Sequence, residues 1–192
     1  MATDLPGASS TGVPELSFVS PVSHSPDPKW IKALQSHFAE WVLGPIRRLV
    51  PSQDWLVGFI LMSCAIDYLA GFWWGRSTQG SVKEAYTGFI NTFFPAGRYD
   101  AEGLYDSLRN GLVHMFTIKG RKYALTHDAP ERHLKSDEHG QIILNAADFE
   151  VDLVIATKAY FSAAESSPEF IRKAQDRYFR DWFLGPSPLH ME

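Results

Sequence analysis

The stretch from Trp55 to Trp74 restricts the fold more than any other part of the sequence, because Asp67 is the only charged residue in it. A stretch of this length and apolarity is long enough to span a membrane. Asp67 would then lie near the centre of the span at a cost of about 2.5–3.5 kcal/mol, and the chain has no second strongly apolar segment to pair with it. We therefore predict a buried core helix and no membrane partner.

The rest of the composition is typical of a soluble globular protein. The chain has 192 residues, of which 45% are hydrophobic and 21% charged, and this excludes collagen-like, disulfide-scaffold and fully disordered chains. A net charge of -4 creates no protein-wide positive field, so any binding of nucleic acid must be local. The single cysteine, Cys64, cannot form an internal disulfide, which predicts a cytoplasmic protein with Cys64 as a small core residue.

Two regions differ in composition. Residues 1–26 are rich in Pro, Gly, Ser and Thr and poor in large apolar side chains. They bury too little apolar surface to offset the conformational entropy lost on ordering, so we expect a flexible tail. Residues 27–192 predict a single domain. Capping residues and prolines within this domain mark the start of helices. Besides the apolar helix, we expect helices at 28–49 with a kink at Gly44-Pro45, at 82–94 after a capping box from Ser81 to Glu84, at 101–116 after Asp100, at 146–166 after Asn145, and at 168–183.

The hydrophobic period changes from helical to extended after the helix at 101–116. Phe116 to Leu125 predicts a β-hairpin that turns near Gly120, and Gln141 to Leu144 predicts a short strand. The expected fold class is therefore mainly α: an antiparallel helical bundle with four or more long helices and a small β-hairpin or sheet insertion at about 116–145.

The helix expected at 101–116 separates an apolar face from a face of titratable and polar residues. At about 100° per residue, one sector is predicted to face the core, and it contains Leu104, Leu108, Gly111, Leu112 and Met115. The other side contains Asp106, Arg109, Asn110 and His114. Asn110 and His114 are four residues apart and are therefore neighbours, and the long side chain of Arg109 can reach His114. We expect these groups to meet at one groove.

The pattern of Arg109, Asn110 and His114 resembles the signature of the HEPN superfamily, an arginine commonly followed by a polar residue and then a histidine after four to six intervening residues. The resemblance implies a helical bundle that cleaves RNA without a metal or other cofactor, generally as a homodimer whose two motifs face each other. It also implies a defence or toxin system, with an antitoxin or regulatory protein as a possible partner. The toxin branch often has a tyrosine two residues after the histidine, where this chain has Phe116.

The chemistry implied by the resemblance suits these residue types. In such a reaction an RNA 2′-hydroxyl attacks its own phosphate and leaves a 2′,3′-cyclic phosphate and a 5′-hydroxyl. His114 is suited to proton transfer as the acid or base, Arg109 to bidentate binding of the phosphate, and Asn110 to positioning. Asp67 and Asp106 are candidate supporting residues for Arg109. The alternative is a structural ion pair in a non-catalytic interaction domain or a nucleotide-binding domain.

Two further clusters follow the motif. Lys119, Arg121 and Lys122 predict a local RNA-binding patch, with a solvated turn as the alternative. Three histidines recur at six-residue intervals beside several acidic residues, but their spacing matches no strong zinc signature and we expect no metal site. These histidines are His127, His133 and His139.

Overall fold

The computed structural model describes residues 25–75 and 78–181. The tail predicted at 1–26 therefore lies almost wholly outside the described residues, as does the predicted end of the last helix at residue 183. Within the described part, the chain is mainly helical, with a small two-stranded sheet. In chain order, the helical elements are α1 (Pro28–Phe38), a π-helical segment (Ala39–Leu43), α2 (Gly44–Leu49), α3 (Trp55–Trp74), α4 (Val82–Phe93), α5 (Ala101–Gly103), a second π-helical segment (Leu104–Arg109), α6 (Asn110–Met115), α7 (Ala146–Glu165) and α8 (Pro168–Asp181).

The π-helical segments join their neighbours without a break, so the described residues form six continuous helices. At the predicted kink the first continuous helix changes from π-helical to α-helical hydrogen bonding: α2 begins at Gly44, with Pro45 in its first turn. Three predicted N-caps are present: Asp27, Asp100 and Asn145 each accept a hydrogen bond from a backbone N–H in the first turn of the following helix. Ser81 departs from the prediction, because it precedes α4 without a side-chain capping bond.

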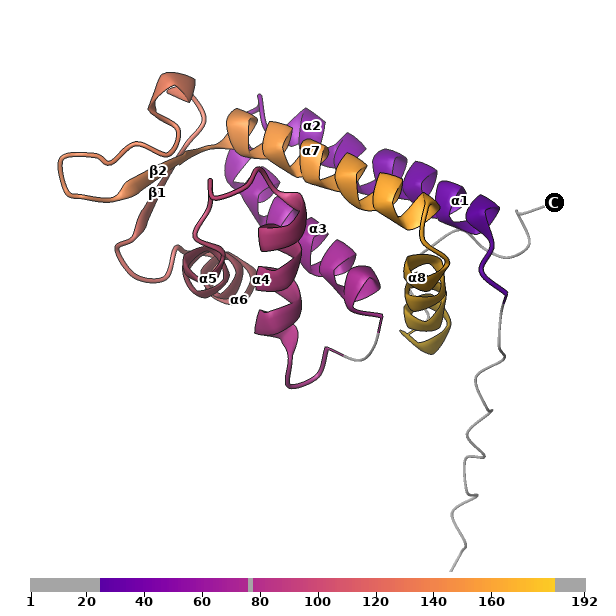
Figure 1. The fold of residues 1–192 in the computed structure, drawn as a ribbon. Coiled ribbons are helices and arrows are strands. Elements are labelled where there is room, and N and C mark those ends of the chain that lie inside the picture. Colours follow the sequence, from indigo (N-terminus) through magenta and orange to yellow (C-terminus); the bar gives the residue numbers. More distant parts are fainter. Residues whose placement is uncertain (1–24, 76–77, 182–192) are drawn as a thin grey trace, which may run out of the picture.

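Helix α3 lies at the centre of the fold. It packs against α2, α4, α6, α7 and α8, and Figure 1 shows these helices arranged around it. Its buried side chains include Phe59, Ile66 and Leu69, which are fully enclosed. Among the described helices, α3 is the one long and apolar enough to cross a membrane by length and composition, and in this structure it forms the core as predicted.

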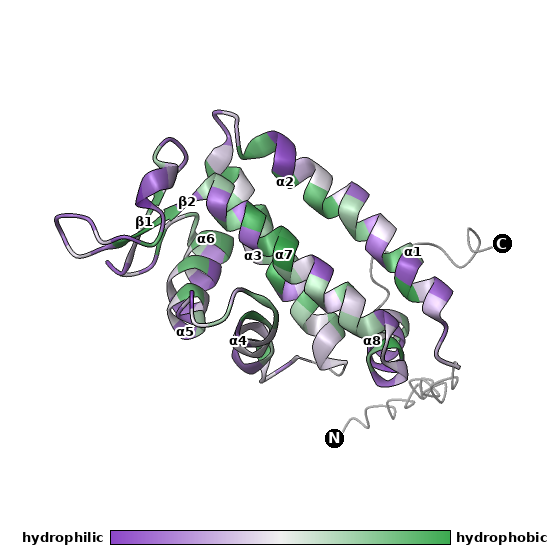
Figure 2. Ribbon diagram, turned by 45° about the horizontal axis from the view of Figure 1, so that its top comes forward, coloured by the Kyte–Doolittle hydropathy of each residue, from purple (hydrophilic) through white to green (hydrophobic). Residues whose placement is uncertain are grey.

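The sheet is parallel, so the predicted hairpin is wrong. Strand β1 (Tyr123–Thr126) pairs with β2 (Ile142–Asn145) in register from Tyr123 opposite Ile142 to Thr126 opposite Asn145. A tight turn at Gly120 would give antiparallel neighbours, whereas parallel strands need a longer crossover. Here the polar loop after β1, with a 3-10 turn (Pro130–Arg132), supplies that crossover. Both strands lie at the start of α7 (Figure 1), and hydrophilic residues predominate in the loops beside them (Figure 2).

Candidate active site

The motif residues lie where the second π-helical segment becomes α6. Asp100 caps the start of this continuous helix, with its Oδ1 3.1 Å from the backbone N of Gly103. A π-helical turn contains i to i+5 hydrogen bonds, and such turns occur frequently at functional sites. The backbone N–H of Asn110 donates to the carbonyl of Tyr105 in this way. The sequence predicted an uninterrupted α-helix, and the π-helical segment was not foreseen.

Gly111 allows the chain to fold back over the helix that carries the motif. After α6 ends, Phe116 adopts a φ of 53°, and the backbone N–H of Lys119 donates to the carbonyl of Ser107 at 3.0 Å. A Cβ at Gly111 would lie 2.3 Å from the Thr117 carbonyl oxygen. The returning backbone therefore requires glycine here, and this explains a residue that is otherwise unfavourable inside a helix.

Arg109 brings the three motif residues together. Its Nη1 lies 3.1 Å from Asn110 Oδ1 and 2.7 Å from His114 Nε2, while its Nε donates to Asp67 Oδ2 at 2.8 Å. The guanidinium also lies over the ring of Tyr105, 5.6 Å from the ring centroid. The predicted convergence is therefore present, but it is centred on the guanidinium and not on a direct contact between Asn110 and His114.

His114 contacts Arg109 through one ring nitrogen. A guanidinium has only donors, so this contact is a hydrogen bond in the tautomer whose Nε2 is the acceptor and whose ring proton is on Nδ1. The side chain lies in the exposed last turn of α6, so an approaching substrate can reach it. The Nε2 electron pair is engaged by Arg109 in this arrangement, so His114 can serve as a general base only where a bound phosphate takes over the Nη1 donor.

The pair formed by Arg109 and Asp67 is only partly accessible. The side chain of Arg109 is 16% exposed and that of Asp67 26% exposed. Burial raises the pKa of the Asp67 carboxyl above its usual value, and the hydrogen bond and positive charge of Arg109 oppose that rise. Asp67 thus has the supporting position that the sequence predicted, on the central helix α3.

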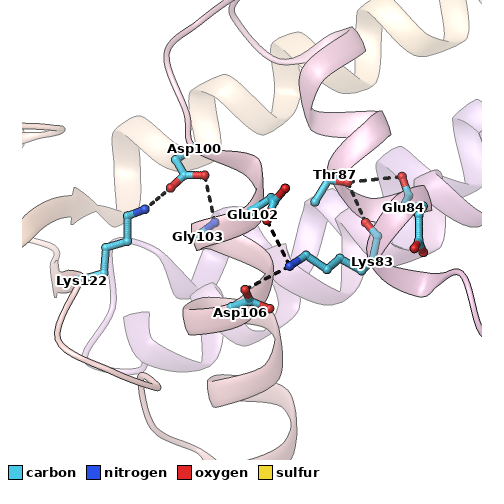
Figure 3. A network of polar contacts seen from close by, with 8 residues as sticks. All are labelled: Lys83, Glu84, Thr87, Asp100, Glu102, Gly103, Asp106 and Lys122. Atoms are coloured by element: carbon cyan, nitrogen blue, oxygen red, sulfur yellow. Dashed lines mark hydrogen bonds and ion pairs between the residues drawn. The ribbon is translucent and has the colours of Figure 1, made fainter.

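The other predicted site residues have different partners. Asp106 pairs with Lys83 of α4 at 3.2 Å, and Figure 3 shows Lys83 reaching between Asp106 and Glu102. Lys122 pairs with Asp100 at the start of the motif helix (Figure 3). The structure therefore does not bring Asp106 to Arg109, and Lys122 is engaged with a carboxylate. Lys119 and Arg121 are exposed in the turn after α6.

A hollow of about 310 Å³ opens beside Arg109. Its wall includes Arg177 of α8, a residue that sequence analysis did not select because nothing in the local pattern of α8 links it to α3. Cys64 also lines the hollow and is exposed, so its predicted place in the core is wrong. The lining residues are Cys64, Asp67, Tyr68, Ala70, Thr78, Val82, Ala85, Arg109 and Arg177.

Met115 corrects the predicted core face of the motif helix. Leu104, Leu108 and Leu112 are buried as expected, but Met115 is 61% exposed. The reason is that α6 ends at Met115 and the chain reverses at Phe116, which is itself 75% exposed. Two large apolar side chains are therefore displayed directly beside His114.

The three spaced histidines are not gathered together. His133 accepts a hydrogen bond at Nδ1 from the backbone N–H of Asn145 and contacts the Tyr99 hydroxyl through Nε2. His127 stacks on Trp55 with ring centroids 5.0 Å apart, and His139 is exposed. Across residues 25–75 and 78–181, no cluster of three or more His, Cys, Asp or Glu side chains is arranged to hold a metal ion.

Comparison with known proteins found no matching family model, no matching curated protein and no matching solved structure. The likeness to HEPN domains therefore depends on the residues of the motif, and the functional argument depends on their geometry.

Proposed function

We propose that this protein is a metal-independent endoribonuclease with a HEPN-like antiparallel bundle. The observation that carries the proposal is the shared contact of Arg109: one guanidinium nitrogen bonds both Asn110 and His114, and the histidine faces solvent. A permanent cation beside a neutral imidazole is the pair that phosphate-ester cleavage by a neighbouring hydroxyl needs.

The proposed reaction assigns one role to each motif residue. His114 Nε2 removes the proton from an RNA 2′-hydroxyl, and O2′ attacks the adjacent phosphorus. Arg109 binds the phosphate oxygens through its planar fork and stabilises the added negative charge. The bond to the 5′-oxygen breaks, that oxygen takes a proton from an acid, and the products carry a 2′,3′-cyclic phosphate and a 5′-hydroxyl. Asn110 holds the guanidinium in position.

The acid and the assembly belong to the same proposal. One histidine cannot take the 2′-hydroxyl proton and supply another to the 5′-oxygen at the same time, so in the proposed homodimer a second His114, in its protonated form, faces the first and is the acid. The exposed side chains of Met115 and Phe116 beside His114 support such an interface, because large exposed apolar groups mark contact surfaces. The single cysteine favours a cytoplasmic location, and the resemblance suggests a defence or toxin system in which an antitoxin or regulatory protein is a candidate partner.

One observation favours a second candidate function. The side chains of Arg109 and Asp67 are mostly enclosed. In the second candidate function, this ion pair has a purely structural role and fixes the packing of α3 against the motif helix. In that case the protein is a non-catalytic HEPN-like interaction domain or nucleotide-binding domain. The two functions differ in whether His114 is needed for any activity on RNA.

The deciding experiment incubates purified protein with mixed cellular RNA in EDTA and analyses the ends of the products. The wild type is expected to cleave and leave cyclic phosphate and 5′-hydroxyl ends. His114→Ala is expected to lower the rate by at least about 100-fold, because general base catalysis contributes that much or more. Arg109→Lys keeps a charge but loses the bidentate fork, and it is also expected to slow cleavage.

Two controls keep the result interpretable. His139→Ala removes an exposed histidine far along the chain from the motif and should cleave at the wild-type rate. Circular dichroism should show that His114→Ala and Arg109→Lys retain their helices. Equal cleavage by wild type and His114→Ala would exclude the assigned mechanism, and no cleavage by the wild type would favour the interaction domain.

A further inference from the structure

Two hollows lie on either side of one pair of residues on α3. Cys64 and Tyr68, one helical turn apart, line both the hollow that contains Arg109 and a second hollow of about 360 Å³. The other residues of the second hollow are Trp41, Val42, Pro45, Leu61 and Ala65. The two hollows are therefore adjacent, and we call them together the α3 groove. One part of this groove is lined by charged residues and the other is almost wholly apolar.

The charged part contains two guanidinium groups on successive turns of α3. Asp67 and Gly71 are four residues apart and lie on one face of the helix. Arg109 reaches Asp67 from the motif helix. Arg177 reaches the same face from α8, where a Cβ at Gly71 would lie 3.3 Å from its Nε. The missing side chain at Gly71 lets the second guanidinium lie against the helix, one turn from the Asp67 that pairs with the first, and both arginines line the same hollow.

The apolar part presents an aromatic ring to solvent. Trp41, in the first π-helical segment, is 65% exposed and contacts the ring of His37 at a centroid distance of 6.3 Å. Tryptophan provides a face on which nucleobases stack. Pro45 and Leu61 extend this apolar surface toward Tyr68.

We propose that the α3 groove binds the RNA nucleotide next to the bond that is cleaved, with its phosphate at Arg109 and Arg177 and its base against Trp41. This inference rests on the proposed function, because it extends the same site. Arg109 is the link: its guanidinium contacts His114 on one side and lines the charged hollow on the other. When the phosphate of the cleaved bond lies at Arg109 and His114, the nucleotide joined to that phosphate extends into the α3 groove.

Charge selects the phosphate over a neutral ligand. The Arg109 fork has five donors: Asp67 accepts from Nε, and Asn110 and His114 contact Nη1, so the described contacts leave Nη2 for the phosphate. Arg177 adds a second guanidinium to the same wall, and paired arginines suit the bidentate recognition of phosphate. An anionic amphiphile such as an alkyl phosphate also has one charged part and one apolar part. The experiment must therefore compare the binding of RNA with the binding of an alkyl phosphate.

The test measures binding of a fluorescent RNA hexamer whose 2′-hydroxyls are all methylated, because this probe cannot undergo attack by O2′. The wild type is expected to bind it, and Arg177→Gln and Trp41→Leu are each expected to weaken binding by about tenfold, the effect of one charged hydrogen bond or one stacked base. Trp41→Leu keeps the apolar character and removes the stacking face. The matched controls are Arg172→Gln, an exposed arginine of α8, and Leu56→Ser, an exposed residue of α3; both should bind as the wild type does.

The outcomes separate the groove from the nuclease. If Arg177→Gln and Trp41→Leu bind the hexamer as tightly as the wild type, the groove does not hold the nucleotide, even where unmodified RNA is cleaved. If both variants lose binding but the wild type cleaves no RNA, the groove assignment holds and the proposed reaction fails. Tighter binding of dodecyl phosphate than of the hexamer, with displacement of the hexamer, would overturn the assignment to RNA.

Discussion

At the scale of single residues, Arg109 combines structural support with a chemical role. Its Nε donates to Asp67, whereas Nη1 faces Asn110 and His114. A guanidinium has five N–H donors in a rigid fork, so the ion pair at Nε and the two contacts of Nη1 leave the Nη2 donors for a phosphate oxygen. The contact with Asp67 fixes the orientation of the fork, and a preoriented cation needs less reorganisation when charge develops on a phosphate. The ion pair and the proposed catalysis are therefore compatible.

Gly111 gives the sharpest stability prediction at this scale. Gly111→Ala gains about 1 kcal/mol of helix propensity, but the new Cβ would lie 2.3 Å from the Thr117 carbonyl oxygen and 2.5 Å from the Lys119 nitrogen. Both are backbone atoms, so the returning segment must move. We expect a net loss of roughly 1–3 kcal/mol in the free energy of unfolding, measured by urea denaturation.

The matched control for this variant is another glycine inside a helix. At Gly44 a Cβ would meet its nearest neighbours at 3.6 Å, an ordinary contact. Gly44→Ala should therefore be neutral or stabilise the protein by up to about 1 kcal/mol. A stable Gly111→Ala variant would show that the segment after α6 does not pack closely on the motif helix.

At the scale of elements, the helices were predictable because their signals are local. A capping side chain such as Asp27, Asp100 or Asn145 acts within its own first turn, and the apolar period of each helix is visible in the sequence. The parallel sheet was not predictable in this way. Its two strands pair across a long loop, and the short run after Gly120 that forms β1 carries no information about which strand it will pair with.

The π-helical segment of the motif helix shows the same limit at a finer level. The sequence placed Arg109, Asn110 and His114 on the correct side of the helix, because an average of about 100° per residue is sufficient for that. It predicted that Arg109 could reach His114, and this contact is present, but it placed Asn110 beside His114, whereas Asn110 contacts Arg109. That detail depends on the i to i+5 bond at Asn110 and on the packing of the returning chain over Gly111.

The loop between the strands contains a pH-dependent contact. His133 accepts from the backbone N–H of Asn145, and the Tyr99 hydroxyl donates to Asp152 at 2.6 Å while contacting His133. Burial lowers the pKa of His133 below its usual value of 6.5, although Asp148 and Asp152 oppose that effect. As pH falls through 6.5, the unfolded chain takes up a proton at this residue before the folded protein does. Stability is therefore lost between pH 6.5 and the lower pKa of the folded state.

The corresponding prediction compares stability at pH 7 and pH 5. Wild-type protein should lose up to about 1.4 kcal/mol for each unit by which the two pKa values of His133 differ. His133→Asn has an oxygen that can accept from Asn145 but does not titrate, so the drop between the two pH values should shrink. His139→Gln, at an exposed histidine, should keep the wild-type drop. An unchanged drop in His133→Asn would assign the pH dependence to other groups.

At the scale of the whole molecule, the candidate site depends on contacts between distant parts of the chain. Asp67 lies on α3, Arg109 on the motif helix and Arg177 on α8, and all three line one hollow. The sequence indicated the pairing of Asp67 with Arg109, because a carboxylate in an apolar helix needs a partner. It gave no sign of Arg177, since an arginine on an amphipathic surface helix is ordinary. Only the packing of α8 on Gly71 places it in the site.

The last prediction concerns self-association. Phe116 is 75% exposed and adopts a φ of 53°, a conformation that asparagine tolerates better than most residues. Phe116→Asn should therefore keep the local fold and remove most of the apolar surface beside His114. We expect the dimer dissociation constant of this variant, measured by sedimentation equilibrium, to be at least about tenfold higher than that of the wild type. RNA cleavage by the variant should also be slower at low protein concentration.

The dependence of the cleavage rate on protein concentration distinguishes a loss of dimers from a local effect of the substitution on His114. If a second copy supplies the acid, raising the concentration of Phe116→Asn should restore cleavage as dimers form again. Leu56→Asn changes an exposed apolar residue in the first turn of α3 and should leave the dimer dissociation constant unchanged. A wild-type protein that stays monomeric while cleaving RNA would require the acid to come from within one chain, and the exposed Met115 and Phe116 would then need another partner.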